Sequence, residues 1–196
     1  MDTEALQTAI ASTRAGLANV RPDQYDAATP CASWTVRDLV NHIVSGVHFF
    51  AAAAATGRPP TPVDGTGTGT GAVIDYTHGD VLAAYDEGAA AAVAAFSAPG
   101  AMEKMIELPF ATMPGAAFIG LAATDQFAHG WDLARATGQG TGLASDLADR
   151  LLDNARHTVP DTLRGDDGRA PFGPVQPPGP DASPADRLAA FLGRHV

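Results

Sequence analysis

The chain contains, at Pro114–Gly138, the run PGAAFIGLAATDQFAHGWDLARATG. Its apolar residues recur every three or four positions, which is the spacing of residues on one face of an α-helix. Phe118 falls on one face and Trp131 on another, so the helix is expected to be buried on two sides. Gly138 stands where a glycine commonly ends a helix. The run therefore predicts a long helix over Pro114–Thr137 that packs between neighbouring helices.

Other stretches of the chain show the same helical period. Thr35 with Asp38 forms a pattern typical of a capping box, which satisfies free N–H groups at the start of a helix. Met102–Leu108 is expected to be a short extended segment, and no alternating pattern is long enough to predict a sheet. The fold class is therefore all-α, most simply a four-helix bundle with extra C-terminal helices. The remaining predicted helices are Thr3–Val20, Thr35–Ala55, Asp80–Ser97, Ser145–Thr158 and Ala185–Arg194.

Two stretches rich in proline and glycine interrupt the helices. Gly57–Gly71 reads GRPPTPVDGTGTGTG, a composition that disfavours both helix and packed strand. Pro160–Pro184 is expected to be an extended wrap or tail before the last short helix. We expect residues 1–140 to form the bundle and residues 141–196 to form a C-terminal helical extension packed on the same domain.

Composition narrows the class of protein. The 196 residues carry a formal net charge of -10, which repels phosphate backbones and disfavours nucleic-acid binding, and 45% hydrophobic residues suffice for a core. A single cysteine excludes an internal disulfide framework and any CxxC site. The first residues lack a basic signal-peptide region, and the apolar stretch Gly46–Ala55 is too short to span a bilayer. The expected protein is soluble and cytoplasmic, with no membrane association.

Two polar residues break the apolar pattern of the predicted helix over Pro114–Thr137. Asp125 and His129 fall in line with Phe118, where a plain core would carry Leu or Val. A buried carboxylate must be paired, hydrogen-bonded or metal-bound, because desolvating a bare charge costs several kcal/mol. Residues four apart project together from successive turns, so this pair suits one metal ion. A hydrogen-bonded Asp–His pair in the core is the alternative.

His42 supplies a third candidate ligand from the predicted second helix. It shares a stripe with Leu39 and Gly46, and Gly46 leaves room one turn further on. His42, Asp125 and His129 would then form a site of two histidines and one carboxylate with open coordination positions. Zn²⁺ suits these ligands best, and Ni²⁺, Fe²⁺ and Mn²⁺ also accept them. A hydrogen-bonded core histidine is the alternative for His42.

Other residues near these motifs each have two possible roles. Asp132, three residues after His129, either orients that imidazole from behind or pairs with Arg135. Arg135 either meets an anionic ligand or is solvated. Trp34 either lines a pocket or packs in the core. Cys31 stands before the second predicted helix, and buried filler is the favoured reading over a nucleophile.

The run TPCASWTVRDLVNHIVSG at Thr29–Gly46, followed by DQFAHGWDLARATG at Asp125–Gly138, resembles the mycothiol-dependent maleylpyruvate isomerase metal-binding family of the DinB-like superfamily. The resemblance is closest to its shorter actinobacterial branch and covers roughly residues 6–138. It implies a DinB-like bundle with metal ligands at His42, Asp125 and His129. The isomerase has glutamate where this chain has Asp125, and DinB-like relatives generally use three histidines. The isomerase's substantial C-terminal domain also has no full counterpart here, so maleylpyruvate isomerisation is not expected.

The resemblance also implies a function. Mycothiol would be the cosubstrate, and the metal would make its thiolate available to attack a small electrophile in a transferase or isomerase. Any catalytic thiol would arrive from outside the chain. Related bundles often dimerise, so a homodimer is an expectation by analogy. Two other readings stay open, a metal- or ligand-binding bundle without turnover and a nonhaem iron oxygenase, which uses the same ligand set.

Overall fold

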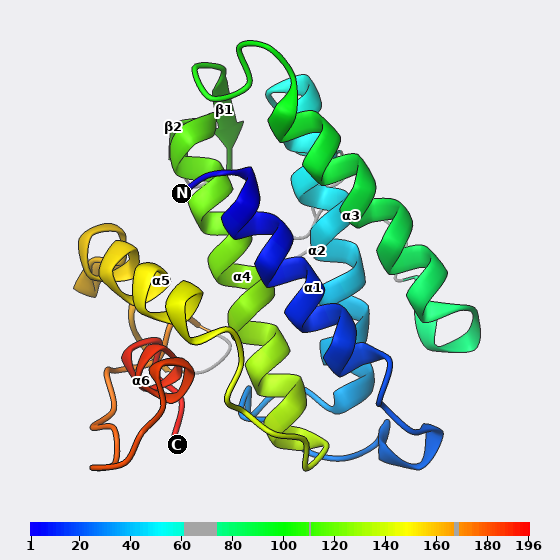
Figure 1. Cartoon of the computed structure of the whole chain (residues 1–196), viewed down its shortest axis with the longest axis vertical. Helices are drawn as coiled ribbons and strands as arrows, with labels where there is room; N and C mark the ends of the chain where they lie inside the picture. The colour runs from blue at the N-terminus through cyan, green and yellow to red at the C-terminus, as the bar shows by residue number, and fades with distance from the viewer. Residues whose placement is uncertain (61–73, 110, 167–168) are drawn as a thin grey trace.

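A computed structural model describes residues 1–60, 74–109, 111–166 and 169–196. Four long helices form its centre: α1 (Thr3–Leu17), α2 (Val36–Thr56), α3 (Val81–Ser97) and α4 (Gly115–Ala136). In Figure 1 they run along the long axis of the molecule. Each helix packs against two others, in the cyclic order α1, α4, α2, α3. The expected all-α bundle is confirmed.

Local capping signals place the helix ends close to where the sequence predicts them. The Thr35 hydroxyl accepts from the backbone of Asp38 while the Asp38 carboxylate accepts from the Thr35 N–H, which is the expected capping box. Gly138 has φ +71° after the last turn of α4, so it adopts the left-handed conformation that ends helices. α1 stops at Leu17 rather than at Val20. These caps fix where α2 begins and where α4 ends, and hence the heights of the polar residues along each helix.

Small residues allow the helices to approach closely. A Cβ atom on Gly130 of α4 would lie 2.5 Å from the Thr13 hydroxyl of α1, and one on Gly88 of α3 would lie 2.6 Å from the Val47 side chain of α2. Large side chains fill the space between these crossings, among them the fully buried Phe118, Phe127 and Trp131 of α4. The prediction that α4 is buried on two sides is therefore confirmed.

A β-hairpin lies at one end of the bundle. Strand β1 (Met105–Leu108) pairs antiparallel with β2 (Ala111–Pro114), with Met105 opposite Pro114. The sequence predicted only an extended segment here and no sheet, so the hairpin corrects that expectation. β2 has no alternating burial that would have revealed it, since its burial pattern is mostly exposed. It leads directly into α4.

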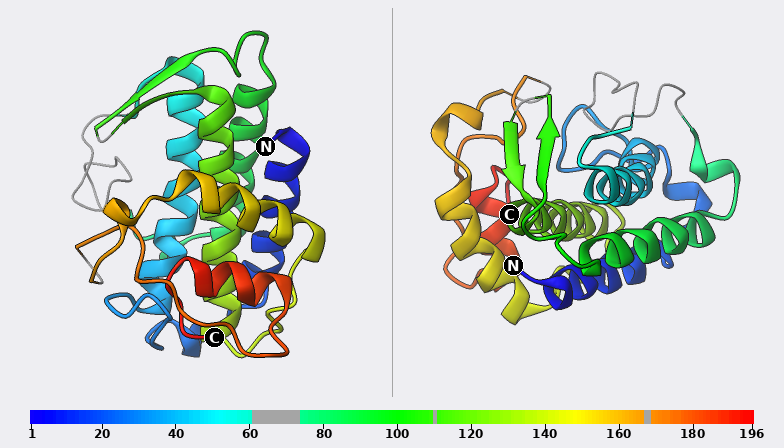
Figure 2. Two further views of the ribbon diagram at one scale, coloured as in Figure 1. Left: turned by 90° about the vertical axis from the view of Figure 1, so that its left-hand side faces the viewer. Right: turned by 90° about the horizontal axis from the view of Figure 1, so that it is seen from above.

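The C-terminal extension packs on one flank of the bundle. α5 (Ser145–Thr158) and α6 (Pro184–Phe191) contact each other and α4, and Figure 2 shows them together beside α4. The described residues also contain three short 3-10 turns: Pro22–Gln24, Tyr76–His78 and Asp161–Leu163. α6 ends three residues before the expected Arg194. The expected loop at Gly57–Gly71 falls largely outside the described residues, and the division of the chain at residue 140 stays a prediction.

α2 is the one helix in the described residues that is long and apolar enough, by length and composition alone, to cross a membrane. The whole helix has 21 residues, so the short apolar run inside it does not by itself exclude a span. However, 67% of the apolar window is buried inside the bundle, as in the core helix of a globular protein.

Candidate metal centre

His42 of α2 and the pair Asp125 and His129 of α4 meet between the two helices. The Asp125 Oδ1 atom lies 3.5 Å from His42 Nε2 and 3.7 Å from His129 Nε2. Two donor atoms that each lie about 2.1 Å from a tetrahedral ion are about 3.4 Å apart. The observed spacing is therefore wider than a good hydrogen bond and close to the spacing of donors around a single ion. The side chains are only 12–20% exposed.

The His42 ring nitrogen Nε2 is buried and has no hydrogen-bond partner among the described residues. Buried polar side-chain atoms are nearly always hydrogen-bonded, and an exception needs a reason such as an ion or a ligand. This atom faces the Asp125 carboxylate at the same point as His129 Nε2. Two imidazole nitrogens and a carboxylate oxygen are ligands that Zn²⁺ and its neighbours in the periodic table accept. The residues present thus fit a divalent metal.

A buried hydrogen-bond chain holds the Asp125 carboxylate from the other side. Gln126, which is fully buried, donates its Nε2 to Asp125 Oδ2 at 3.2 Å and accepts from the Tyr85 hydroxyl of α3 at 2.9 Å. The Thr13 hydroxyl of α1 donates to the Gln126 backbone carbonyl at 2.7 Å. All four helices therefore contribute, with α2 accepting from Gln126 through the Ile43 carbonyl. The sequence did not predict this series of hydrogen bonds, because Gln126 and Tyr85 are far apart in sequence.

Gly46 lies one turn above His42, as expected, and its lack of a side chain matters to Asp125. A Cβ atom at this position would lie 3.2 Å from the Gln126 amide and 3.4 Å from Asp125 Oδ2. A larger residue would therefore press on the carboxylate and its partner rather than on the imidazole of His42. The glycine allows α2 and α4 to approach each other at the height of the three candidate ligands.

His129 is held from behind by Asp132. The ring nitrogen Nδ1 lies 3.1 Å from Asp132 Oδ2, and Asp132 is completely buried. This contact leaves Nε2 directed toward Asp125, which is the role that a carboxylate behind a ligating imidazole commonly has. The alternative partner for Asp132 was Arg135, but Arg135 is exposed and Asp132 pairs instead with Arg194 at 2.9 Å. Nothing before the structure pointed to Arg194.

The protonation states differ among the three candidate ligands. Burial and the neighbouring charge of His129 lower the pKa of His42. Burial opposes the charge of Asp125, but the nearby His42 ring and the charges of both imidazoles outweigh it, so its pKa is lowered. Burial likewise opposes a charge on His129, but Asp132, Cys31 and Asp125 outweigh it and raise the pKa of His129 to about 10. The protein without metal therefore carries a proton on His129 that a metal must displace.

Trp34 covers the two histidines. Its ring centroid lies 4.5 Å from that of His42 and 5.6 Å from that of His129, and the two imidazoles meet edge to face. The side chain is half-buried and stands in the loop that leads into α2. The structure therefore places Trp34 against the candidate ligands, where it also packs against the core.

A second group of metal-type residues lies on the far side of His129. The Cys31 Sγ atom, a His129 ring nitrogen and an Asp132 carboxylate oxygen are all within 4.8 Å of one another. However, Asp132 already accepts from His129, Cys31 and the Arg194 guanidinium, and a buried guanidinium beside these atoms repels a cation. Cys31, which the sequence predicted to be buried filler, therefore lies close to the candidate ligands. The group of His42, Asp125 and His129 is nevertheless the better candidate for a metal site.

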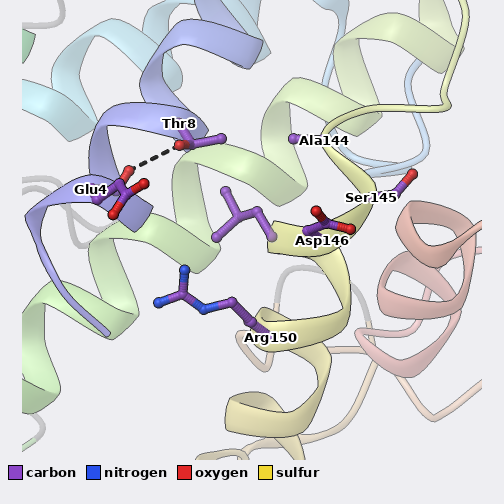
Figure 3. Close-up of a pocket in the computed structure, with 7 residues that line it drawn as sticks. Glu4, Thr8, Ala144, Ser145, Asp146 and Arg150 are labelled. Carbon is purple, nitrogen blue, oxygen red and sulfur yellow. Dashed lines mark hydrogen bonds between the residues drawn. The ribbon is translucent and has the colours of Figure 1, made fainter.

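One hollow in the described part of the structure lies away from these residues. It has a volume of about 490 Å³ and lies between α1 and the start of α5, where Figure 3 shows Arg150 extending from α5 toward Glu4 and Thr8. None of the three candidate ligands lines it. Glu4, Asp146 and Arg150 are its charged lining residues, so its charge does not favour one class of ligand.

Comparisons with known proteins agree with the two motifs. The family model of the mycothiol maleylpyruvate isomerase N-terminal domain matches residues 6–134, a range that contains His42, Asp125 and His129. Two uncharacterized proteins from two strains of Mycobacterium tuberculosis are each 42% identical to the chain over 181 residues. Each alignment covers 92% of this chain and 90% of the relative. No solved structure shows a significant match.

Proposed function

Because the chain belongs to the family of the mycothiol maleylpyruvate isomerase N-terminal domain, we propose that it binds a divalent metal and uses a small thiol to modify an electrophile. The family is a DinB-like helical domain, and the observed bundle agrees with it. The proposed metal ligands are His42, Asp125 and His129. Mycothiol is the proposed thiol, and the reaction is a transfer or an isomerisation. A cytoplasmic location suits this proposal, because cytosolic thiols are kept reduced.

The observation that carries the proposal is the orphaned Nε2 atom of His42. It is buried, lacks a hydrogen-bond partner in the described chain and lies 3.5 Å from Asp125 Oδ1, which in turn lies 3.7 Å from His129 Nε2. A purely structural cluster would close these gaps to ordinary hydrogen bonds of about 2.9 Å. An ion between the three atoms accounts for both the open spacing and the unpaired nitrogen. Zn²⁺ is the metal we expect, since it accepts this donor set without a strict geometry.

The side chains of the site set its charge. Two neutral imidazoles and the single carboxylate of Asp125 leave a net positive charge on a divalent ion, which favours an anionic sulfur over a neutral ligand. Such an ion supplies, when bound, the charge that lowers the pKa of a thiol from its usual value of about 8.5. Asp132 keeps the proton of His129 on Nδ1, and Trp34 limits access of water from the loop side. The chain thus holds and shields the site, while the thiol is the nucleophile.

The same ligand set supports one other activity. Two histidines and one carboxylate also hold Fe²⁺ in oxygenases, so oxygen consumption is the alternative outcome for the iron-loaded protein. A bundle that binds metal without turnover is the other alternative. The three readings differ in what the metal-loaded protein consumes, so a single set of assays separates them.

The proposal is tested with zinc-loaded protein purified without a His-tag. Mycothiol and monochlorobimane are mixed, and the sulfur–carbon bond that forms as chloride leaves and the thiol loses its proton is followed by fluorescence. We expect a rate that requires both metal and protein and that His42→Ala abolishes. His157→Ala, which changes an exposed histidine on α5, should leave the rate unchanged. A rate equal to that without metal contradicts thiol activation, and oxygen uptake with Fe²⁺ instead would favour the oxygenase.

A further inference from the structure

The last residues of the chain place an arginine inside the protein, next to the candidate metal centre. The Arg194 side chain is only 11% exposed, and its partner Asp132 is completely buried. Arg194 Nε donates to Asp132 Oδ1 at 3.2 Å, and Nη2 donates to Oδ2 at 2.9 Å. This two-pronged contact fixes both the position and the plane of the carboxylate. Asp132 Oδ2 is the same atom that contacts His129 Nδ1 at 3.1 Å.

The fold aims Arg194 inward through the end of α6. Gly193 has φ +99°, and the backbone N–H groups of Gly193 and Arg194 donate to the carbonyls of Ala190 and Ala189. These two bonds form a Schellman motif, which turns the chain sharply after a helix. The backbone of Gly173 packs so closely against Gly193 that no side chain fits there, because a Cβ on Gly193 would lie 2.5 Å from the Gly173 Cα. The turn is therefore a built feature rather than a frayed end.

A second arginine anchors this turn. The Arg164 guanidinium donates to the carbonyls of Gly173 and Phe191 at 3.1 and 2.8 Å and lies 4.6 Å above the Phe191 ring. Arg164 thus ties the segment after α5 to the end of α6. The stretch that the sequence predicted as a tail holds Arg194 in place.

We propose that Arg194 is a positioning residue of the metal centre, acting through Asp132 on His129. This inference rests on the proposed function, since it assumes that His129 Nε2 binds the metal. Arg194 holds the Asp132 carboxylate in the one orientation that accepts from His129 Nδ1, and this orientation directs Nε2 toward His42 and Asp125. Arg194 lies outside residues 6–134, so the family resemblance does not assign it this role.

Arg194 and a metal bound at His129 should each affect the other. A carboxylate behind a ligating imidazole fixes the ring and raises its strength as a ligand, and its loss typically lowers metal affinity about 10- to 100-fold. Arg194 is one step further away, so about tenfold is expected for its loss. Because coupling between two binding events is reciprocal, metal at His129 should also hold the end of the chain more firmly against α4. The C-terminal extension would then be part of the site.

The test compares three variants of the full chain. Arg194→Gln removes the charge, Arg194→Lys keeps the charge but not the two-pronged contact, and Arg187→Gln is the control. Arg187 lies on α6, seven residues before Arg194, and forms an exposed ion pair with Asp149 at 2.9 Å. Zinc affinity is measured by competition with a chromophoric chelator, and the His129 ring ¹⁵N shifts are measured by NMR in the metal-free protein. Melting temperatures report folding separately.

We expect about tenfold weaker zinc binding for Arg194→Gln, an intermediate loss for Arg194→Lys and less than a twofold change for Arg187→Gln. The ¹⁵N shifts of His129 should move in both Arg194 variants. If folded Arg194→Gln protein binds zinc as wild type does and leaves the ring shifts unchanged, the inference is overturned. If Arg194→Gln does not fold, wild-type behaviour of Arg194→Lys in both measurements overturns it. If wild type itself binds no zinc, the proposed function fails, and the ring shifts still test the contact of Arg194 with Asp132 and His129.

Discussion

The raised pKa of His129 predicts how strongly zinc affinity depends on pH. In the metal-free protein the pKa of His129 is raised to about 10, because hydrogen bonds to Asp132 and Cys31 and nearby carboxylate charges outweigh the effect of burial. A metal at Nε2 must displace this proton. Between pH 8 and pH 6 the ring is protonated throughout, so each unit of lower pH should weaken zinc binding tenfold, or about 100-fold over the range.

The other two ligands do not add to this dependence. The pKa of His42 is lowered from its ordinary value by burial and by the charge of His129, which favours the neutral imidazole that binds a metal. The pKa of Asp125 is also lowered, since the two histidines outweigh the effect of burial, so its carboxylate is already ionised. Zinc binding should therefore release one proton, and that proton comes from His129.

The assay is a zinc competition titration at pH 6, 7 and 8, with the chelator's own pH dependence measured in the same buffers. Calorimetry in two buffers of different ionisation enthalpy counts the protons released. The expected results are a 100-fold fall in affinity from pH 8 to pH 6 and about one proton per zinc. An affinity that changes less than about threefold, or no proton released per zinc, would refute the assignment of His129 as the protonated ligand.

Three further predictions follow from the same contacts. Gly46→Ala should weaken zinc binding several-fold, because its methyl group would press on Asp125 Oδ2 at 3.4 Å. The free energy of unfolding should change little, because the helix preference of alanine over glycine, about 1 kcal/mol, offsets this crowding. Competition titration checks the first effect and thermal unfolding checks the second. Tyr85→Phe should leave the buried Gln126 Oε1 without its donor and lower the free energy of unfolding by about 1–2 kcal/mol, or the Tm by about 2–8 °C; an unchanged Tm would show that the bond contributes nothing. The metal-free protein should lose stability as pH rises from 6.5 to 10, because the raised pKa of His129 stabilises the folded state fully below the pKa of the unfolded chain and no longer above the pKa of the folded protein. The total loss is about 4 kcal/mol. A free energy of unfolding, measured with denaturant, that does not change across this pH range would contradict the prediction.

The features that the sequence predicted correctly are those that depend on neighbours in the chain. The capping box at Thr35 and Asp38 and the glycine after α4 each act within one turn, so composition and spacing reveal them. Asp125 and His129 also share a face because they are four residues apart on one helix. Their convergence with His42 required both a helical period and a resemblance to a known family.

The features that the sequence did not predict depend on contacts between distant residues. Arg194 lies 62 residues after Asp132, and Tyr85 lies 41 residues before Gln126. A surface-type residue such as arginine gives no local sign that it is buried, and Arg135, which is closer in sequence, was the natural partner to expect for Asp132. β2 was missed for a related reason, because a four-residue strand with mostly exposed residues has no periodic signal.

The most direct test of the account is an anomalous-difference map from zinc-soaked crystals, collected on both sides of the zinc absorption edge. We predict one peak at about 2.0–2.2 Å from His42 Nε2, His129 Nε2 and an Asp125 carboxylate oxygen. A peak instead between Cys31, Asp132 and His129 Nδ1, or no peak at either group in crystals that diffract well, would contradict the proposed metal centre.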